Sequence, residues 1–79
     1  MARIRLTVLV RDTWRDRYPQ VVEHCRQAGL AVERELVAVG VIVGSIEEEL
    51  LVAVSRVEGV SAVEPERANR ALESPDRPA

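Results

Sequence analysis

The sequence predicts an α+β sandwich, a four-stranded antiparallel sheet with two helices on one of its faces. Three observations lead to this fold class. Residues 3–11 alternate apolar and polar side chains as a half-buried strand does, residues 30–44 are extended in character almost throughout, and a segment with helical spacing stands on each side of that stretch. In chain order the elements are strand, helix, strand, strand, helix and strand.

The first strand, RIRLTVLVR, has the most regular period of two in the chain. One predicted face carries Ile4, Leu6, Val8 and Val10, and the other carries Arg3, Arg5, Thr7, Leu9 and Arg11. We therefore expect one apolar face against helices and one arginine-bearing face without a cover.

The first helix is predicted before Gly29, a residue typical of helix C-termini. Its apolar stripe consists of Val21, Val22, Cys25 and Ala28. Pro19 leaves two interpretations open, because an interior proline removes a backbone hydrogen bond. Either the helix begins near Pro19 and residues 14–18 form a separate turn, or a continuous helix from Thr13 is kinked at Pro19.

Residues 30–44, LAVERELVAVGVIVG, exceed the usual length of one strand, so they are predicted to form a hairpin that reverses near Val37–Val39. The absence of an Asn-Gly turn leaves the position of the reversal open by a few residues. Within the first of the two strands, the alternation places Val32, Arg34 and Leu36 on one face, with Glu33 and Glu35 on the other.

The second helix is predicted to start at a capping box, with Ser45 as N-cap and Glu48 three residues later. The acidic run 47–49 favours a helix N-terminus electrostatically. The helical stripe is Ile46, Leu50, Ala53, Val54 and Val57, and Gly59 ends the helix.

The last strand is predicted over Val60–Glu64, and Pro65 ends its ladder or marks it as an edge. With this strand the order becomes βαββαβ, the ferredoxin-like sandwich, in one domain covering residues 1–66. Residues 67–79 contain two prolines and little apolar content, so we expect a flexible C-terminal tail.

Charge and composition exclude several function classes. The net charge of −2 gives no basic excess for nucleic acid, and all eleven cations are arginines, so lysine-dependent Schiff-base and P-loop chemistry are excluded. No apolar run is long enough to cross a membrane. A single cysteine and the lack of a signal-peptide pattern favour a cytoplasmic protein.

The residues also indicate no enzyme, metal or cofactor. His24 and Cys25 are adjacent, so on a helix they point about 100° apart and cannot act as one nucleophile and base. Cys25 is predicted in the core and His24 at the surface, and neither has metal-ligand spacing. Trp14 and Tyr18 are predicted to cover the edge of the core, with an exposed interface pair as the alternative.

The stretch ELLVAVSRVEGVSAVEPER resembles the end of subtilisin propeptides and of stand-alone subtilisin-propeptide-like proteinase inhibitors. Their pattern is a helix with a Leu- or Val-rich last turn, a short turn, and then V-x-x-V-E-x-D/E, which this chain matches over residues 60–66. The family has the same βαββαβ fold.

The resemblance implies binding to a subtilisin-like serine protease, as an inhibitor or as a folding chaperone. The open sheet face would lie on two protease helices, with Glu64 and Glu66 at the N-termini of those helices. The segment after the last strand would occupy the substrate cleft in extended form, and it consists of Arg67, Ala68, Asn69, Arg70, Ala71 and Leu72. The alternative is a regulatory or assembly domain that forms a homodimer through its open face or an edge strand, with or without a small ligand.

Overall fold

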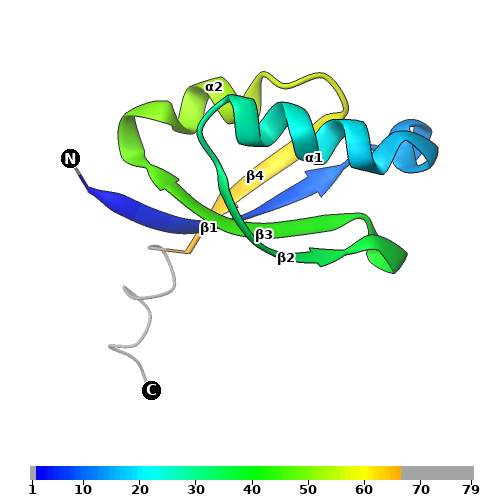
Figure 1. The fold of residues 1–79 in the computed structure, drawn as a ribbon, viewed down its shortest axis with the longest axis horizontal. Coiled ribbons are helices and arrows are strands. Elements are labelled where there is room, and N and C mark those ends of the chain that lie inside the picture. Colours follow the sequence, from blue (N-terminus) through cyan, green and yellow to red (C-terminus); the bar gives the residue numbers. More distant parts are fainter. Residues whose placement is uncertain (1, 67–79) are drawn as a thin grey trace, which may run out of the picture.

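The computed structural model describes residues 2–66, which form a ferredoxin-like α+β sandwich (Figure 1). The antiparallel sheet has the strand order β2-β3-β1-β4, with both helices on the same face. Within these residues the elements are β1 (Arg3–Val10), the 3₁₀ helix η1 (Asp12–Arg17), α1 (Tyr18–Gln27), β2 (Ala31–Leu36), the 3₁₀ turn η2 (Val37–Val39), β3 (Val41–Glu47), the 3₁₀ turn η3 (Glu48–Leu50), α2 (Leu51–Ser55) and β4 (Val60–Pro65). The predicted fold class is confirmed.

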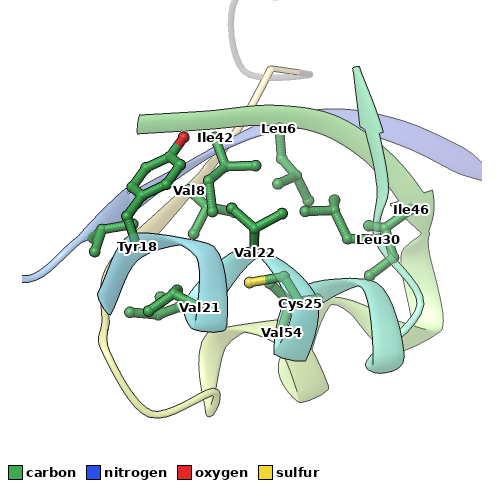
Figure 2. Packing of buried hydrophobic residues seen from close by; sticks show 12 residues of the cluster. Leu6, Val8, Tyr18, Val21, Val22, Cys25, Leu30, Ile42, Ile46 and Val54 are labelled. Atoms are coloured by element: carbon green, nitrogen blue, oxygen red, sulfur yellow. The ribbon is translucent and has the colours of Figure 1, made fainter. Parts of the chain in front are cut away.

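The core lies between the sheet and the two helices, on the face that we call the covered face (Figure 2). The inward side chains of β1, including Leu6 and Val8, are fully buried, as are Ile42 and Ile46 of β3. From the helices, the fully buried residues are Val21, Cys25 and Val54. These branched aliphatic residues, together with the small Cys25, fill the thin layer that one sheet and two helices enclose.

The first helix follows the first of the two predicted alternatives. Residues 12–17 form the separate turn η1, and α1 then begins with Pro19 in its first turn, where its missing N–H costs no helical hydrogen bond. Tyr18 is buried, and its hydroxyl donates a 2.6 Å hydrogen bond to the carbonyl of Val41. Trp14 is half-buried against the core, with the Arg17 guanidinium 4.2 Å above its ring. Both aromatic residues therefore cover the edge of the core.

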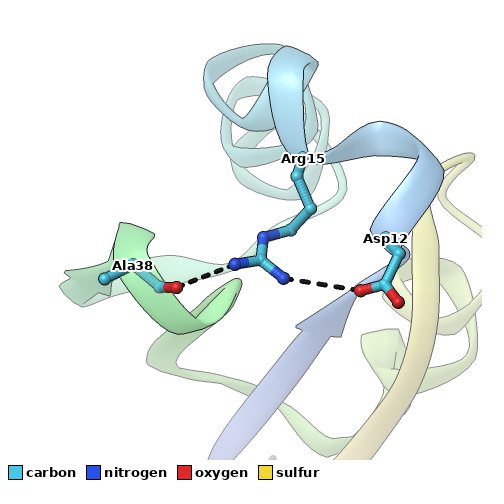
Figure 3. Close-up of polar contacts among 3 residues, drawn as sticks. All are labelled: Asp12, Arg15 and Ala38. Atoms are coloured by element: carbon cyan, nitrogen blue, oxygen red, sulfur yellow. Dashed lines mark hydrogen bonds and ion pairs between the residues drawn. The ribbon is translucent and has the colours of Figure 1, made fainter.

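The hairpin reverses at Val37–Val39, as predicted. Gly40 ends the turn with a φ of 70°, a left-handed conformation that glycine adopts without strain. Arg15 of η1 holds the turn from outside, since its guanidinium donates a 2.7 Å hydrogen bond to the Ala38 carbonyl and lies 3.4 Å from Asp12 (Figure 3).

The predicted capping box is wrong. Ser45 lies inside β3, paired with Arg5 of β1, and the strand continues to Glu47. The helical segment begins only at η3, and α2 has no side-chain cap. The sequence signal for the longer strand is the alternation of Ile42, Gly44 and Ile46, all of which face the core. The long strand β1 pairs with β3 over this whole length, from Val41 to Glu47.

The predicted alternation of β2 is also wrong at its first half, because the strand contains a bulge. The register with β3 shifts between Val32 and Arg34, so the extra residue Glu33 reverses the faces that follow. Val32 therefore packs against the core, whereas Arg34 and Leu36 lie on the other face of the sheet.

Candidate protein-binding face

The sheet face opposite the helices, which we call the open face, is built from the outward side chains of all four strands. Directly paired residues of antiparallel strands project from the same face, so the register defines rows across the sheet. In the order β4, β1, β3, β2, the apolar row is Ala62, Leu9, Val41 and Leu36; the mixed row is Glu64, Thr7, Val43 and Arg34; and the arginine row is Glu66, Arg5, Ser45 and Ala31.

One end of the open face is apolar. All four members of the apolar row are half-buried, as are Thr7 and Val43 of the mixed row. Beyond this row lies the turn η2, where Val37 and Val39 are 56% and 63% exposed. A contiguous apolar area at the surface of a small domain is typical of a surface that another protein covers.

The other end of the open face carries ion pairs. Arg3 and Glu47 are paired across β1 and β3 at 3.2 Å. Arg5 lies 3.0 Å from Glu33 of β2 and 3.7 Å from Glu66, the residue directly after β4. Since Ser45 of β3 is small, the Arg5 side chain can cross that strand to reach Glu33. Arg3 and Arg5 therefore lie, as predicted, on a sheet face that residues 2–66 leave uncovered.

These pairs change the expectation for Glu66. Its carboxylate already has Arg5 as a counter-ion, and its backbone N–H donates a 2.8 Å hydrogen bond to the Arg5 carbonyl. Glu66 is therefore held against the sheet by its own chain. A partner that bound this carboxylate would compete with Arg5 across an exposed pair, which costs little.

Glu64 and Arg34 differ from the other charges of the open face. Both are exposed, and within residues 2–66 neither forms an ion pair or a side-chain hydrogen bond. They stand at the two ends of the mixed row, Glu64 on the edge strand β4 and Arg34 on the edge strand β2. Both charges are therefore available to a partner.

The two sheet edges are poorly suited to strand addition. The N–H groups of neighbouring residues in a strand point to opposite sides, and the Glu66 N–H points to β1. The position before it, on the outer side of β4, is occupied by Pro65. Since proline has no N–H, the outer edge lacks one hydrogen-bond donor there. On β2, the bulge at Glu33 interrupts the ladder, and three consecutive residues, 33–35, are charged. Bulges, charges and prolines are the devices that protect edge strands. The open face is the better candidate for an interface.

The two titratable groups of the covered face, Tyr18 and Cys25, are both buried. Cys25 is fully buried, and this burial raises the pKa of its thiol to about 11. Burial, and then the nearby Glu35 carboxylate, raise the pKa of Tyr18 above its ordinary value. His24 is exposed, as predicted. Among residues 2–66, no group of three or more His, Cys, Asp or Glu side chains is placed to hold a metal ion.

The predicted partner-binding residues are only partly within the structure. Glu64 lies in β4 and Glu66 directly after it, whereas Arg67, Ala68, Asn69, Arg70, Ala71 and Leu72 lie outside the described residues. Arg34 was not singled out from the sequence, because only the bulge places it on the open face. Within the described part of the chain, no helix has the length and apolar character needed to cross a membrane.

Comparison with known proteins adds no family to this description. No protein-family model, curated protein or solved structure matches the chain.

Proposed function

We propose that this chain is a protein-binding module that uses its open face to bind a subtilisin-like serine protease. The observation that carries the proposal is a half-apolar sheet face that residues 2–66 leave uncovered, and on it a carboxylate, Glu64, that has no ion-pair partner within the same residues. Glu64 lies on β4, the strand that precedes the C-terminal segment. The resemblance of residues 60–66 to the end of subtilisin propeptides supports this class of partner. The proposed setting is the cytoplasm, and the proposed role is inhibition or assistance in folding.

The physical basis is the combination of two kinds of contact. Burial of the apolar row and its neighbours stabilises a complex by removing apolar surface from water. A carboxylate at the N-terminus of a partner helix accepts hydrogen bonds from free backbone N–H groups and interacts favourably with the helix dipole. Glu64 is better placed for this contact than Glu66, because Glu66 first has to leave Arg5. In this proposal, residues 67–72 occupy the protease cleft by strand addition.

The experiment is a titration of a subtilisin-type protease with the full chain, with hydrolysis of a small peptide substrate as the readout. We expect competitive inhibition, and we expect Leu9→Asp on the open face to weaken it by about 100-fold, since a buried unpaired charge costs several kcal/mol. Val52→Asp is the matched control, because Val52 lies on α2 and is 57% exposed. Truncation after Glu66 should abolish competition with substrate.

Unchanged hydrolysis at about 10 μM chain, where a specific inhibitor would be near saturation, contradicts the proposal. Equal inhibition by the Leu9→Asp and Val52→Asp variants contradicts the assignment of the open face. Circular dichroism of each variant separates loss of binding from loss of the fold.

A further inference from the structure

We propose that the open face also binds a second copy of this chain, in a two-fold dimer whose axis lies in the interface, parallel to the strands and between β1 and β3. The proposal is independent of protease binding. It rests on the arrangement of charged and apolar residues in the rows of the open face. The two-fold rotation brings the apolar row of one copy against the apolar row of the other, and Glu64 against Arg34.

The geometry follows from the register. Rotation about this axis exchanges the positions of β1 and β3, and those of β2 and β4, while each row stays at its own height. Each open-face residue of β1 therefore meets, in the second copy, the residue that it pairs with in its own sheet. Leu9 meets Val41 of the second copy, and Thr7 meets its Val43. Such an interface is isologous, since the same patch serves both copies.

The apolar row becomes the centre of the contact. Its four members face the apolar row of the second copy, so half-buried aliphatic side chains are covered without bringing a charge against them. Aligned packing of two sheets face to face is a standard arrangement, with a spacing of about 10 Å.

The charges are matched by the same operation. Glu64 on β4 meets Arg34 on β2 of the second copy, and the reciprocal pair forms on the other side of the axis. These are the two open-face charges that have no partner within residues 2–66. Arg3 meets Glu47 of the second copy, so the pair at 3.2 Å within one chain is extended into a four-charge network. Glu33 and Glu66 approach the second copy's Glu66 and Glu33, but each already lies against an Arg5.

The size of the face limits the affinity. Four strands about 4.8 Å apart, over three rows about 7 Å apart, give a flat area of roughly 400 Å² per copy. This is below the ~800 Å² per partner of a standard interface. We therefore expect a weak dimer, with a Kd between about 10 μM and about 1 mM. Because the same face is covered, dimerisation and protease binding would exclude each other.

The test is sedimentation equilibrium of the full chain from about 1 μM to about 1 mM, spanning the expected Kd. We expect reversible dimerisation of the wild type. Both Glu64→Arg and Arg34→Glu should weaken it by about 10-fold or more, because each places two like-charged pairs across the axis. An equimolar mixture of the two variants should associate again, since every such pair is then of opposite charge. The double variant Glu64→Arg/Arg34→Glu should dimerise like the wild type for the same reason.

Glu58→Arg is the matched control, because Glu58 is an exposed residue of the turn after α2 and lies off the open face. It should leave dimerisation unchanged within about twofold. A wild type that stays monomeric at about 1 mM overturns the proposal, and so does a mixture of the single variants that associates no better than each variant alone. Rescue in the mixture cannot arise from misfolding, so the test remains decisive if one variant is less stable.

Discussion

The two faces of the same sheet differ in burial and in the kind of side chain that they carry. On β1, the inward residues Leu6 and Val8 are fully buried beneath the helices, whereas the outward residues between them, Thr7 and Leu9, are only half-buried. The covered face contains aliphatic side chains, one tyrosine and one cysteine, and the open face contains an apolar row beside ion pairs. A single strand thus contributes one half of its residues to the core and the other half to the face that we propose as a binding surface.

The comparison is made testable by replacing one leucine on each face. Leu6→Ala should lower the free energy of unfolding by about 2–5 kcal/mol, because it leaves a cavity in the core. Leu9→Ala should lower it by less than about 1 kcal/mol, since the half-buried side chain loses only part of its transfer free energy. Urea unfolding of both variants measures the difference. Equal losses would contradict the distinction between the faces.

The covered face should also make stability depend on alkaline pH. The buried thiol of Cys25 has its pKa raised to about 11, so the folded chain keeps a proton that the unfolded chain releases near pH 9. Stability is then complete below pH 9 and decreases by about 2–3 kcal/mol as the pH rises to about 11. The raised pKa of Tyr18 acts in the same direction at higher pH.

Cys25→Ala is the control for this pH dependence. The chain has no lysine, so few other groups titrate in the alkaline range. Thermal unfolding from pH 8 to pH 11 should show a smaller decrease for the variant than for the wild type. The same decrease in both would show that the thiol is not protected from solvent.

Tyr18 connects the covered face to the hairpin through one hydrogen bond. Tyr18→Phe removes the hydroxyl that donates to the Val41 carbonyl and leaves the rest of the ring in place. We expect a loss of about 1 kcal/mol in the free energy of unfolding, the usual net contribution of such a bond. Amide hydrogen exchange should become faster around residues 36–41 and not in α2. A uniform change over the whole chain would argue against this local role.

The smallest effect is expected for Ser45, on the open face. Ser45→Ala should change the free energy of unfolding by less than about 0.5 kcal/mol, because Ser45 is a strand residue here. A helix N-cap would lose about 1 kcal/mol on the same substitution. A loss of that size would contradict the extension of β3 to Glu47.

The fold class could be predicted from the sequence because two of its patterns are simple. The alternation of residues 3–10 reflects a strand covered on one face, and the stripe before Gly29 reflects a helix that packs with one side on the sheet. The start of α2 could not be predicted, because Ser45 followed by Glu48 fits a helix N-cap as well as the end of a strand. Pairing with the long strand β1 keeps these residues in β3 as far as Glu47. Gly44 shows how closely the strands of the sheet approach one another, because a Cβ at this position would clash with the Ala31 carbonyl oxygen of β2.

The open face was predicted in outline, but its charge pattern was not. Arg3 and Arg5 follow directly from the period of two in the first strand. The positions of Arg34 and Glu33 depend on the bulge in β2, and a bulge is set by pairing with β3. The engagement of Glu66 by Arg5 also joins residues that are far apart in the chain. The predictions for residues 67–72 remain predictions.

The central claim is that the open face is where this chain meets another protein. The most direct test is a dilution series followed in methyl-resolved ¹H–¹³C NMR spectra of the full chain. We predict concentration-dependent shifts for the methyl groups of Leu9, Val41 and Val43, with none for Leu6 or Ile42. Shifts confined to Leu50 and Val52 near the helices would contradict the claim, because the chain would then meet its partner through the other side of the sheet. The absence of any shift up to about 1 mM would contradict the dimer.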